Sequence, residues 1–336
     1  MKAQGPVEQC IRCVHFRNSP ANLESVFKGM NTMSSGHASV RKDDGVCLLH
    51  DIYLSADSHC EQFRGAACAH TGAPAASPVS EVRRDDERRM ATYHFGMGAL
   101  YWLDPDNDHS PFPPVERALR DPDGLLAVGG NLAPERLISA YRQGIFPWYS
   151  DDQPILWWSP DPRSVLFPDR LRISRSLRKT LRRQRYLISF DRAFDEVVLA
   201  CAQPRPDQAG TWITPEMMCA YARLHAAGVA HSVEAWENGE LAGGLYGLAI
   251  GKVFFGESMF ARRTDASKAA FVHLVRQLRA WGYGLVDCQV QSAHLDSLGA
   301  ENIPRSHFIQ LLTRLCDQPG VPAPWELDPA IAEAQT

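Results

Sequence analysis

The sequence has no run of apolar residues that approaches the roughly eighteen needed for a membrane-spanning helix. Its first ten residues, MKAQGPVEQC, also lack the apolar stretch of a secretory signal. These two absences predict a cytoplasmic protein without a membrane partner. The chain does have 336 residues, 45% of them hydrophobic and 22% charged. That is enough apolar material for a core and, by length, enough for two or three domains.

Cysteine is abundant near the N-terminus. Five of the nine cysteines fall in the first fifth of the chain: Cys10, Cys13, Cys47, Cys60 and Cys68. In a reducing compartment such a cluster indicates a metal site before it indicates disulfides. Cys10 and Cys13 have the spacing of half a zinc site, and Cys47 and Cys60 could supply two more thiolates. We therefore predict a zinc site, with an iron–sulfur site as the second interpretation. The alternative is that the thiols are free. In either case residues 1–65 could be a separate module joined to the rest of the chain by gene fusion.

Changes of composition divide the chain into five segments. The Cys-containing module spans residues 1–65. Residues 66–92 contain no aromatic residue, are rich in Ala, Pro and Ser and include a charge run, which is typical of a linker. After it we expect a small mixed α/β domain, a catalytic domain and a tail, at 93–168, 169–318 and 319–336.

The pattern of residues 231–290 predicts the order strand, strand, strand, helix, strand. Asn238-Gly239, the strongest short signal for a β-hairpin, separates the first two strands. The expected elements are strands at 231–236, 240–250, 252–258 and 284–290, a helix at 265–281, and upstream helices at 114–120 and 134–143. This order predicts an α/β (α+β) fold with an acyltransferase core of the GNAT type.

Glycine is missing where a CoA-dependent acyltransferase of this topology would need it. Such an enzyme holds the CoA pyrophosphate with backbone N–H groups of a glycine-rich turn before its long helix. Here the corresponding connection, SMFARRTDASKAA, has no glycine after Gly256. The core is therefore expected to take its acyl group from another carrier.

A strongly basic segment spans residues 170–185, RLRISRSLRKTLRRQR. Half of its sixteen positions are Arg or Lys, and none is acidic. With helical spacing, one face carries Arg175, Arg178, Lys179, Arg182 and Arg183. This face predicts binding to nucleic-acid phosphates, with a solvated helix face as the alternative.

Polar residues interrupt two otherwise apolar strands. Glu257 and Ser258 end one predicted strand, while Asp287 and Gln289 lie two residues apart and so share a face of another. Polar groups in so apolar a strand are costly to bury unpaired. They either line a site or form a structural network.

Tryptophans cluster in the stretch GIFPWYSDDQPILWWSP. Exposed tryptophans beside basic residues can stack on nucleic-acid bases. We expect Trp157 and Trp158 to fill the core of the small domain, whereas for Trp148 a core position and a stacking role are equally consistent with the sequence.

From about residue 97 to residue 316 the chain resembles the bacterial leucyl/phenylalanyl-tRNA–protein transferases. The matching stretches are FPPVERAL, GLLAVGGNLAPERLISAYRQGIFPWYS, PILWWSPDPR, ISRSLRK, GTWIT, HSVE, GGLYG, VFFGESMF, DASKAA, DCQV and SLGA. They occur in order and with sensible spacing, and so are more specific than any single motif above.

The resemblance implies transfer of Leu or Phe, with Met as a further candidate, from charged tRNA to proteins that begin with Lys or Arg. In the family, this transfer marks the acceptor proteins for degradation by the N-degron pathway. The family's aminoacyl and adenosine site would comprise Trp148, Trp212, Leu245, Phe254, Gly256, Ser258, Leu274 and Leu278. Its polar site residues match Glu257, Asp287 and Gln289, and its tRNA-binding surface matches the basic segment. A monomer is expected.

The chemistry that the resemblance implies needs no cofactor for catalysis, because the ester that links an amino acid to tRNA is already activated. As a hypothesis, Asp287 orients Gln289, which accepts a hydrogen bond from the attacking amine, and Glu257 holds a nearby cationic or polar group. The pocket is expected to exclude β-branched Ile and Val by shape. The alternatives are an aminoacyl-tRNA-dependent ligase with another acceptor and a non-catalytic tRNA-binding protein.

Overall fold

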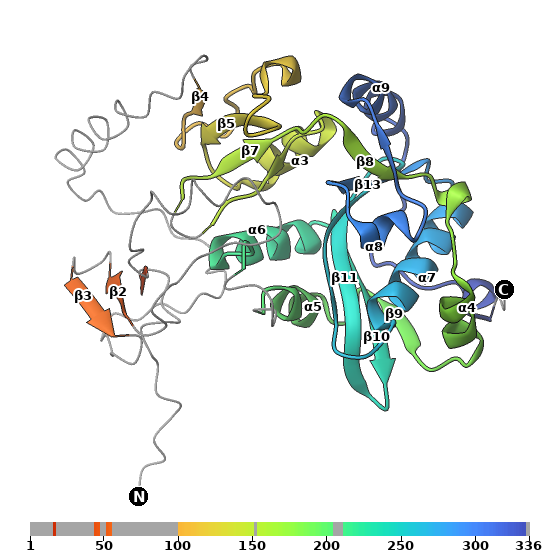
Figure 1. Cartoon of the computed structure of the whole chain (residues 1–336). Coiled ribbons are helices and arrows are strands. Elements are labelled where there is room, and N and C mark those ends of the chain that lie inside the picture. The colour runs from red at the N-terminus through yellow and green to blue at the C-terminus, as the bar shows by residue number, and fades with distance from the viewer. Residues whose placement is uncertain are drawn as a thin grey trace, which may run out of the picture.

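The computed structural model describes residues 100–150, 153–203 and 211–333, together with three short strands nearer the N-terminus (Figure 1). These strands, β1 (Phe16–Arg17), β2 (Asp44–Cys47) and β3 (Ile52–Ser55), pair antiparallel in the order β1-β2-β3. Cys10, Cys13 and Cys60 lie outside the described residues, and of Cys47 only the strand position is described. The metal site therefore stays a prediction. Within the described ranges, no group of three or more His, Cys, Asp or Glu side chains could hold a metal ion, and no helix could cross a membrane.

A four-stranded sheet begins the main body of the chain, in the order β4-β5-β7-β6. Its strands are β4 (Tyr101–Leu103), β5 (Leu125–Gly129), β6 (Phe146–Pro147) and β7 (Leu156–Trp158). Helix α3 (Pro134–Arg142) begins at its proline and ends before Gly144, as expected, while the helix expected at 114–120 is a single 3₁₀ turn, η3 (Val115–Arg117). Trp157 and Trp158 are buried, which confirms their predicted place in the core.

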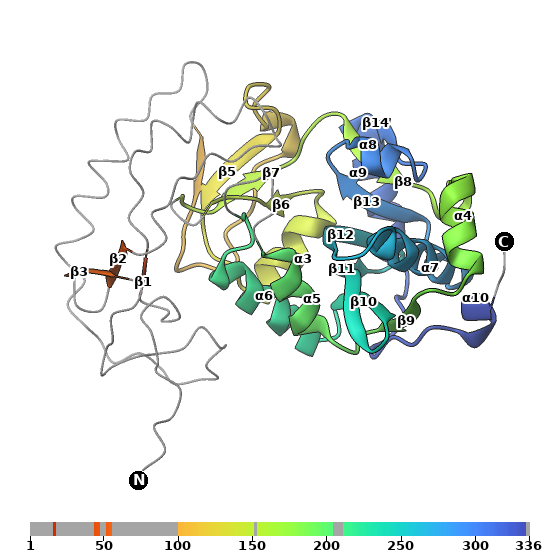
Figure 2. The same ribbon diagram turned by 60° about the horizontal axis from the view of Figure 1, so that its bottom comes forward.

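A seven-stranded mixed sheet forms the centre of the protein, in the order β14-β8-β13-β12-β11-β10-β9 (Figures 1 and 2). The strands are β8 (Arg163–Leu166), β9 (Leu187–Phe190), β10 (Ala230–Glu237), β11 (Glu240–Ile250), β12 (Val253–Ala261), β13 (Leu285–Gln289) and β14 (Glu301–Ile303). Only β12 and β13 pair parallel in this sheet. Together with the helices, this mixed sheet confirms an α+β fold.

The predicted strand, strand, strand, helix, strand order is confirmed. At the β10–β11 turn, Asn238 and Gly239 have φ angles of 54° and 82°, the pair of positive values that a type I′ hairpin turn requires. Helix α7 (Ala266–Ala280) follows β12, and β13 comes next.

Helices cover both faces of the central sheet (Figures 1 and 2). Side chains alternate along a strand, so Leu245 packs into the core under α7, whereas Tyr246 packs with α5 (Phe194–Cys201) and α6 (Pro215–Ala226) on the other face. The remaining helical elements are η4 (Pro168–Arg170), α4 (Arg175–Arg182), α8 (Ala293–Asp296), α9 (Arg305–Leu315) and α10 (Pro329–Glu333).

Two segments pack across the boundaries expected from composition. β8 falls in the range assigned to the small domain, yet it pairs with β13 and β14 in the central sheet. The segment expected to be a tail contains Trp325, whose side chain is only 1% exposed. Both segments are attached to the central domain by contacts between residues far apart in the sequence, and local composition does not predict such contacts.

The sheet opens between β12 and β13. Their parallel pairing covers only Val253–Phe255 against Leu285–Asp287, while β12 runs on to Ala261. Beyond Phe255 β12 stays paired with β11 but no longer with β13, so the other edge of residues 256–261 lies beside an opening.

Candidate active site

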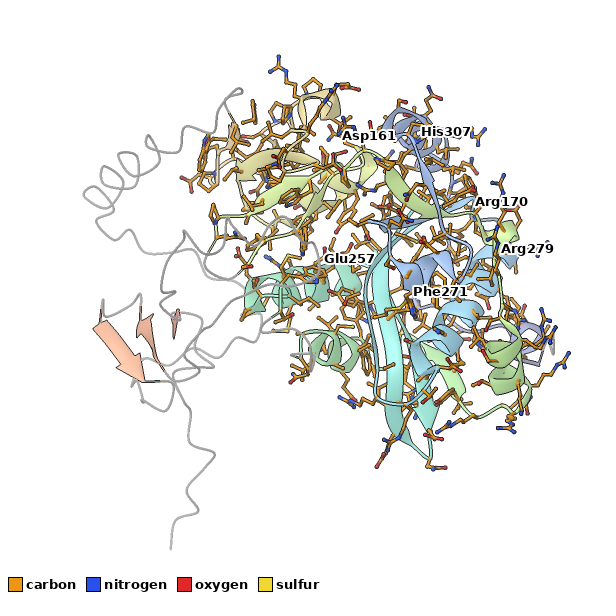
Figure 3. All side chains as sticks on the ribbon, viewed as in Figure 1. Asp161, Arg170, Glu257, Phe271, Arg279 and His307 are labelled. Atoms are coloured by element: carbon orange, nitrogen blue, oxygen red, sulfur yellow. The ribbon has the colours of Figure 1, made fainter. Side chains whose placement is uncertain are left out.

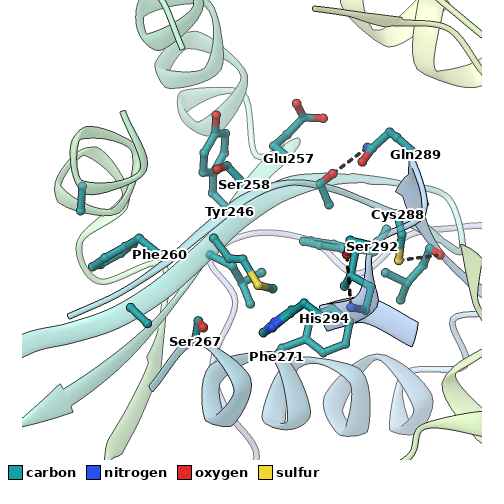
Figure 4. Close-up of a pocket in the computed structure, with 18 of the residues that line it drawn as sticks. Tyr246, Glu257, Ser258, Phe260, Ser267, Phe271, Cys288, Gln289, Ser292 and His294 are labelled. Atoms are coloured by element: carbon teal, nitrogen blue, oxygen red, sulfur yellow. Dashed lines mark hydrogen bonds between the residues drawn. The ribbon is translucent and has the colours of Figure 1, made fainter. Parts of the chain in front are cut away.

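A cavity of about 750 Å³ occupies this opening (Figure 4). Its wall comes from β11, β12 and β13, from the end of α5, from the first turns of α7 and from the segment around α8. The predicted site residues that line it are Leu245, Phe254, Gly256, Glu257, Ser258, Asp287 and Gln289. In Figure 4, Glu257 and Gln289 lie at one end, and Ser267 and Phe271 project from the helix at the other. The first end is polar; the second, called the apolar end below for its hydrophobic side chains, is also lined by the polar Ser267 and His294.

Glu257 forms the centre of a three-membered polar cluster. Its Oε1 lies 2.6 Å from the Tyr141 hydroxyl and its Oε2 lies 2.8 Å from the Tyr221 hydroxyl, while the two hydroxyls are 2.6 Å apart. Tyr141 comes from α3, Tyr221 from α6 and Glu257 from β12. The cluster therefore links helices α3 and α6 to the central sheet. Figure 3 shows Glu257 between α6 and that sheet.

Enclosure by protein raises the pKa of Glu257 to about 8. Loss of hydration is the main cause, and the nearby Asp287 carboxylate raises the pKa further; the hydrogen bonds with Tyr141 and Tyr221 oppose this shift. Burial also raises the pKa of both phenols well above their usual value. A carboxyl group with this pKa is mostly protonated at neutral pH.

Asp287 forms a fully buried ion pair with Arg163 of β8. The Arg163 Nε lies 2.8 Å from Oδ1 and its Nη2 2.7 Å from Oδ2, a bidentate geometry. The guanidinium also donates to the Gly144 carbonyl at 3.2 Å and lies between the rings of Phe146 and Phe308. Asp287 is therefore held rigidly and its charge is compensated.

Gln289 is positioned through its backbone and its side chain. Its backbone N–H donates to Asp287 Oδ1 at 3.1 Å, and its side-chain Nε2 donates to the Gly256 carbonyl at 2.6 Å. The residue has a φ of 54°, in the left-handed region that non-glycine residues seldom adopt. With the amide nitrogen fixed in this way, the Gln289 Oε1 is presented as a hydrogen-bond acceptor.

The apolar end contains only part of the predicted aminoacyl pocket. Leu245, Phe254 and Phe271 line the cavity. Leu274 and Leu278 lie one and two turns further along α7, are fully buried in the core behind these residues, and do not line the cavity. Phe271 was not predicted from the sequence, although it lies on the same face of α7 as Leu274 and Leu278.

Trp148 and Trp212 are both half-buried and pack against the core on the α6 side of the sheet. The chain segments that carry them are close together, since the hydroxyl of Tyr149 lies 3.5 Å from Thr214 Oγ1 and 3.3 Å from a Glu216 carboxylate oxygen. Neither tryptophan lines the cavity. Their predicted contact with adenosine stays a prediction.

The basic segment forms the helix α4, whose N-terminus is capped by the Ser174 hydroxyl. Leu177 is buried, and the basic side chains predicted to bind tRNA are all exposed: Arg175, Arg178, Lys179, Arg182 and Arg183. Two hydrogen bonds hold this part of the chain to the loop before α7: Thr180 donates to Asp265 at 3.1 Å and Tyr186 to the Thr264 carbonyl at 2.6 Å. That loop also carries Arg262, which lines the cavity, so the basic surface and the cavity are linked by a short segment.

Three residues that hold the polar end together were not predicted from the sequence: Tyr141, Tyr221 and Arg163. Each contacts its partner over more than 30 residues of sequence, and no local periodicity marks such a contact. The one available signal was the position of Tyr141 and Arg163 inside stretches shared with the transferases.

Comparison with known proteins identifies the family. The family model described as leucyl/phenylalanyl-tRNA protein transferase matches residues 165–313, and the model of its N-terminal domain matches residues 130–161. The leucyl/phenylalanyl-tRNA–protein transferase of Nitrosomonas europaea is 65% identical over 219 residues, which cover 65% of this chain and 93% of that protein. This chain belongs to the leucyl/phenylalanyl-tRNA–protein transferase family.

Other transferases of the family match at similar levels. The protein from Stutzerimonas stutzeri is 59% identical over 67% of this chain and 99% of its own length, and that from Methylococcus capsulatus is 57% identical over 68% and 98%. Among solved structures, that of L-PGS from Bacillus licheniformis matches over 44% of this chain and 48% of that protein's chain, with 12% sequence identity. Its TM-score of 0.29 is too low to support an argument about the fold. The family assignment thus rests on sequence.

Proposed function

We propose that this chain transfers leucine or phenylalanine from charged tRNA to the N-terminal amino group of acceptor proteins that begin with Arg or Lys. The observation that carries the proposal is the cavity between β12 and β13, which has Glu257 and Gln289 at one end and an apolar end opposite them. The 57–65% identity to curated transferases supports the same activity. We further propose that the central sheet is a GNAT-like acyltransferase core that works in the cytoplasm as a monomer.

In the proposed reaction the acceptor's α-amine attacks the carbonyl carbon of the aminoacyl ester. A C–N bond forms, the C–O bond to the terminal ribose breaks, and the ribose hydroxyl leaves with the proton that the amine loses. The ester is already activated, so no cofactor is required. Positioning alone can contribute roughly 7–11 kcal/mol to such a step.

The polar end supplies what the amine needs. Gln289 Oε1 accepts a hydrogen bond from the attacking amine, and Asp287 with Arg163 holds Gln289 in place. An amine attacks only in its neutral form, and its reference pKa is near 8. Because Glu257 is mostly protonated at neutral pH, it offers a hydrogen-bonding group without a negative charge that would stabilise the unreactive ammonium form.

The test is transfer of radiolabelled leucine from Leu-tRNA to a protein with N-terminal Arg, using the full chain without ATP or CoA. An acceptor that differs only in having N-terminal Ala is the substrate control. Incorporation into the Arg acceptor alone supports the proposal. Salt-sensitive tRNA binding without incorporation would refute it and favour a binding role, and transfer to a different acceptor would assign another ligase activity.

The role of Gln289 has its own test. Gln289→Ala is expected to lower kcat by about 10²-fold, the size of effect that a misplaced reacting group can cause. The matched control is Gln291→Ala, since Gln291 is exposed and hydrogen-bonds Asp296 and Asn302 rather than the cavity groups. A kcat for Gln289→Ala within a few-fold of wild type would show that the amine is activated by another group.

A further inference from the structure

The C-terminal segment that follows α9 returns to the central sheet and inserts Trp325 into its core. The side chain is 1% exposed, and its indole N–H donates to the Val321 carbonyl at 3.2 Å. The backbone N–H of Trp325 donates to Asp191 at 2.9 Å, and that of Asp328 donates to the Gln277 side chain of α7 at 2.8 Å. The segment is therefore fastened at several points around the indole, beyond residue 313 where the family match ends.

Aromatic rings surround the indole. It stacks on the His231 imidazole at 3.7 Å with an interplanar angle of 4°, and His231 is itself held by Asp191 at 2.8 Å. The rings of Trp281 and Tyr283 lie 4.9 Å and 6.1 Å away. A side chain so enclosed has essentially one position.

Phe254 connects this aromatic cluster to the cavity. Its ring centroid lies 6.0 Å from that of Trp325, and Phe254 also lines the cavity wall. A Cβ atom on Gly247 of β11 would come within 2.6 Å of the Phe254 ring, so the ring lies directly over a strand position without a side chain. Gly247 on one side and Trp325 on another thus fix the depth to which this ring reaches.

We propose that Trp325 is a specificity-determining residue that acts through Phe254, holding the ring at the depth at which the apolar end of the cavity fits a leucine side chain. The inference rests on the proposed function, because it identifies Phe254 as part of the aminoacyl pocket. Trp325 is a positioning residue and does not touch the substrate. If the indole is removed, the Phe254 ring can move into the vacated space and the pocket becomes deeper, which favours phenylalanine over leucine.

The experiment compares kcat/KM for Phe-tRNA and Leu-tRNA in the full chain and in Trp325→Ala. We expect the ratio of Phe to Leu to rise by about tenfold, since roughly one methylene of pocket depth is worth at least about tenfold in such a site. The change should appear as a higher KM for Leu-tRNA with little change in kcat, because the polar cluster lies at the other end of the cavity. Trp325→Phe keeps an aromatic ring at this position and should restore most of the wild-type ratio.

A purely structural role for Trp325 would give a different result. Loss of folded protein lowers transfer from both tRNAs equally and leaves the ratio unchanged. The matched control is Leu312→Ala, which removes a fully buried side chain of α9 in the other core cluster and should leave the ratio as in wild type. If Trp325→Ala does not fold, Trp325→Leu takes its place and should raise the ratio, with Trp325→Phe as the aromatic control that stays near the wild-type ratio.

Two further results bear on the inference independently. Combined with Phe254→Leu, Trp325→Ala should have no additional effect on the ratio; additive effects would show that Trp325 does not act through Phe254. A crystal structure of Trp325→Ala should show the Phe254 ring displaced toward the vacated space, and an unmoved ring would overturn the inference. The crystal structure does not depend on transfer, whereas absence of transfer by wild type would refute the proposed function.

Discussion

The three oxygen contacts around Glu257 determine how many protons the cluster holds. Its two contacts with Tyr141 and Tyr221, and the contact between the two phenols, all lie within 2.6–2.8 Å. Each hydrogen bond needs one proton between its two oxygens. If both phenols donate to Glu257, the contact between the two phenols is left without a proton. A proton on the carboxyl group, which the raised pKa of Glu257 favours at pH 7, supplies the third.

Glu257→Gln tests this count, because an amide can also accept one hydrogen bond and donate another. At pH 5 the variant should be within about 1 kcal/mol of wild type in its free energy of unfolding. The pKa of Glu257 is about 8 in the folded protein, above its reference value of 4.5. The stability contributed by its protonation is complete below pH 4.5 and is lost as the pH rises through 8. That shift sets an upper limit of about 5 kcal/mol, and partial solvent contact reduces the expected loss to on the order of 3 kcal/mol.

The assay is urea unfolding of both proteins at each pH unit from 5 to 9. The variant should gain on wild type by on the order of 3 kcal/mol across this range, most of it between pH 5 and 8. Glu240→Gln, at a carboxylate whose side chain is 81% exposed, should show a flat difference. If the difference for Glu257→Gln is equally flat, Glu257 is ionised at pH 7 and the three-proton ring does not exist.

Three further outcomes are expected. Arg163→Met leaves Asp287 buried without its counter-ion and should destabilise the protein by about 3–5 kcal/mol in urea unfolding. The double variant Arg163→Met with Asp287→Leu should recover most of that loss. Equal losses in the single and the double variant would mean that the pair is not coupled. The double variant Arg178→Glu with Arg182→Glu should weaken tRNA binding at least about tenfold and flatten its salt dependence. Arg314→Glu, at an exposed residue of α9, is the control and should change neither. An unchanged salt slope in the double variant would show that α4 is not part of the tRNA-binding surface. Transfer from Ile-tRNA should be at least about tenfold slower than from Leu-tRNA in kcat/KM; comparable rates would show that the apolar end of the cavity does not select by branching.

Local elements were predictable from the sequence because their signals are local. Asn238-Gly239 specifies its hairpin through the positive φ angles that only a few residues adopt, and Pro134 with Gly144 delimits α3. The polarity of Glu257, Asp287 and Gln289 within apolar strands was equally visible.

What those side chains contact was not visible, because the partners come from distant elements. Asp287 was expected to orient Gln289, and it does accept the Gln289 backbone N–H, but its carboxylate is bound chiefly to Arg163, 124 residues away. The burial of Trp325 escaped notice for the same reason. Its segment is rich in proline and shows neither a helical nor a strand period, and the rings that enclose the indole come from distant elements.

The place of β8 bears on how such a protein can be divided. This strand lies between β13 and β14, although most of the sheet is formed by residues after 186. A fragment that begins at residue 169 would therefore lack an interior strand, expose two unpaired strand edges and leave the Asp287 charge without Arg163. The chain therefore cannot be divided at residue 168, the boundary that composition marks, without removing an interior strand from the central sheet.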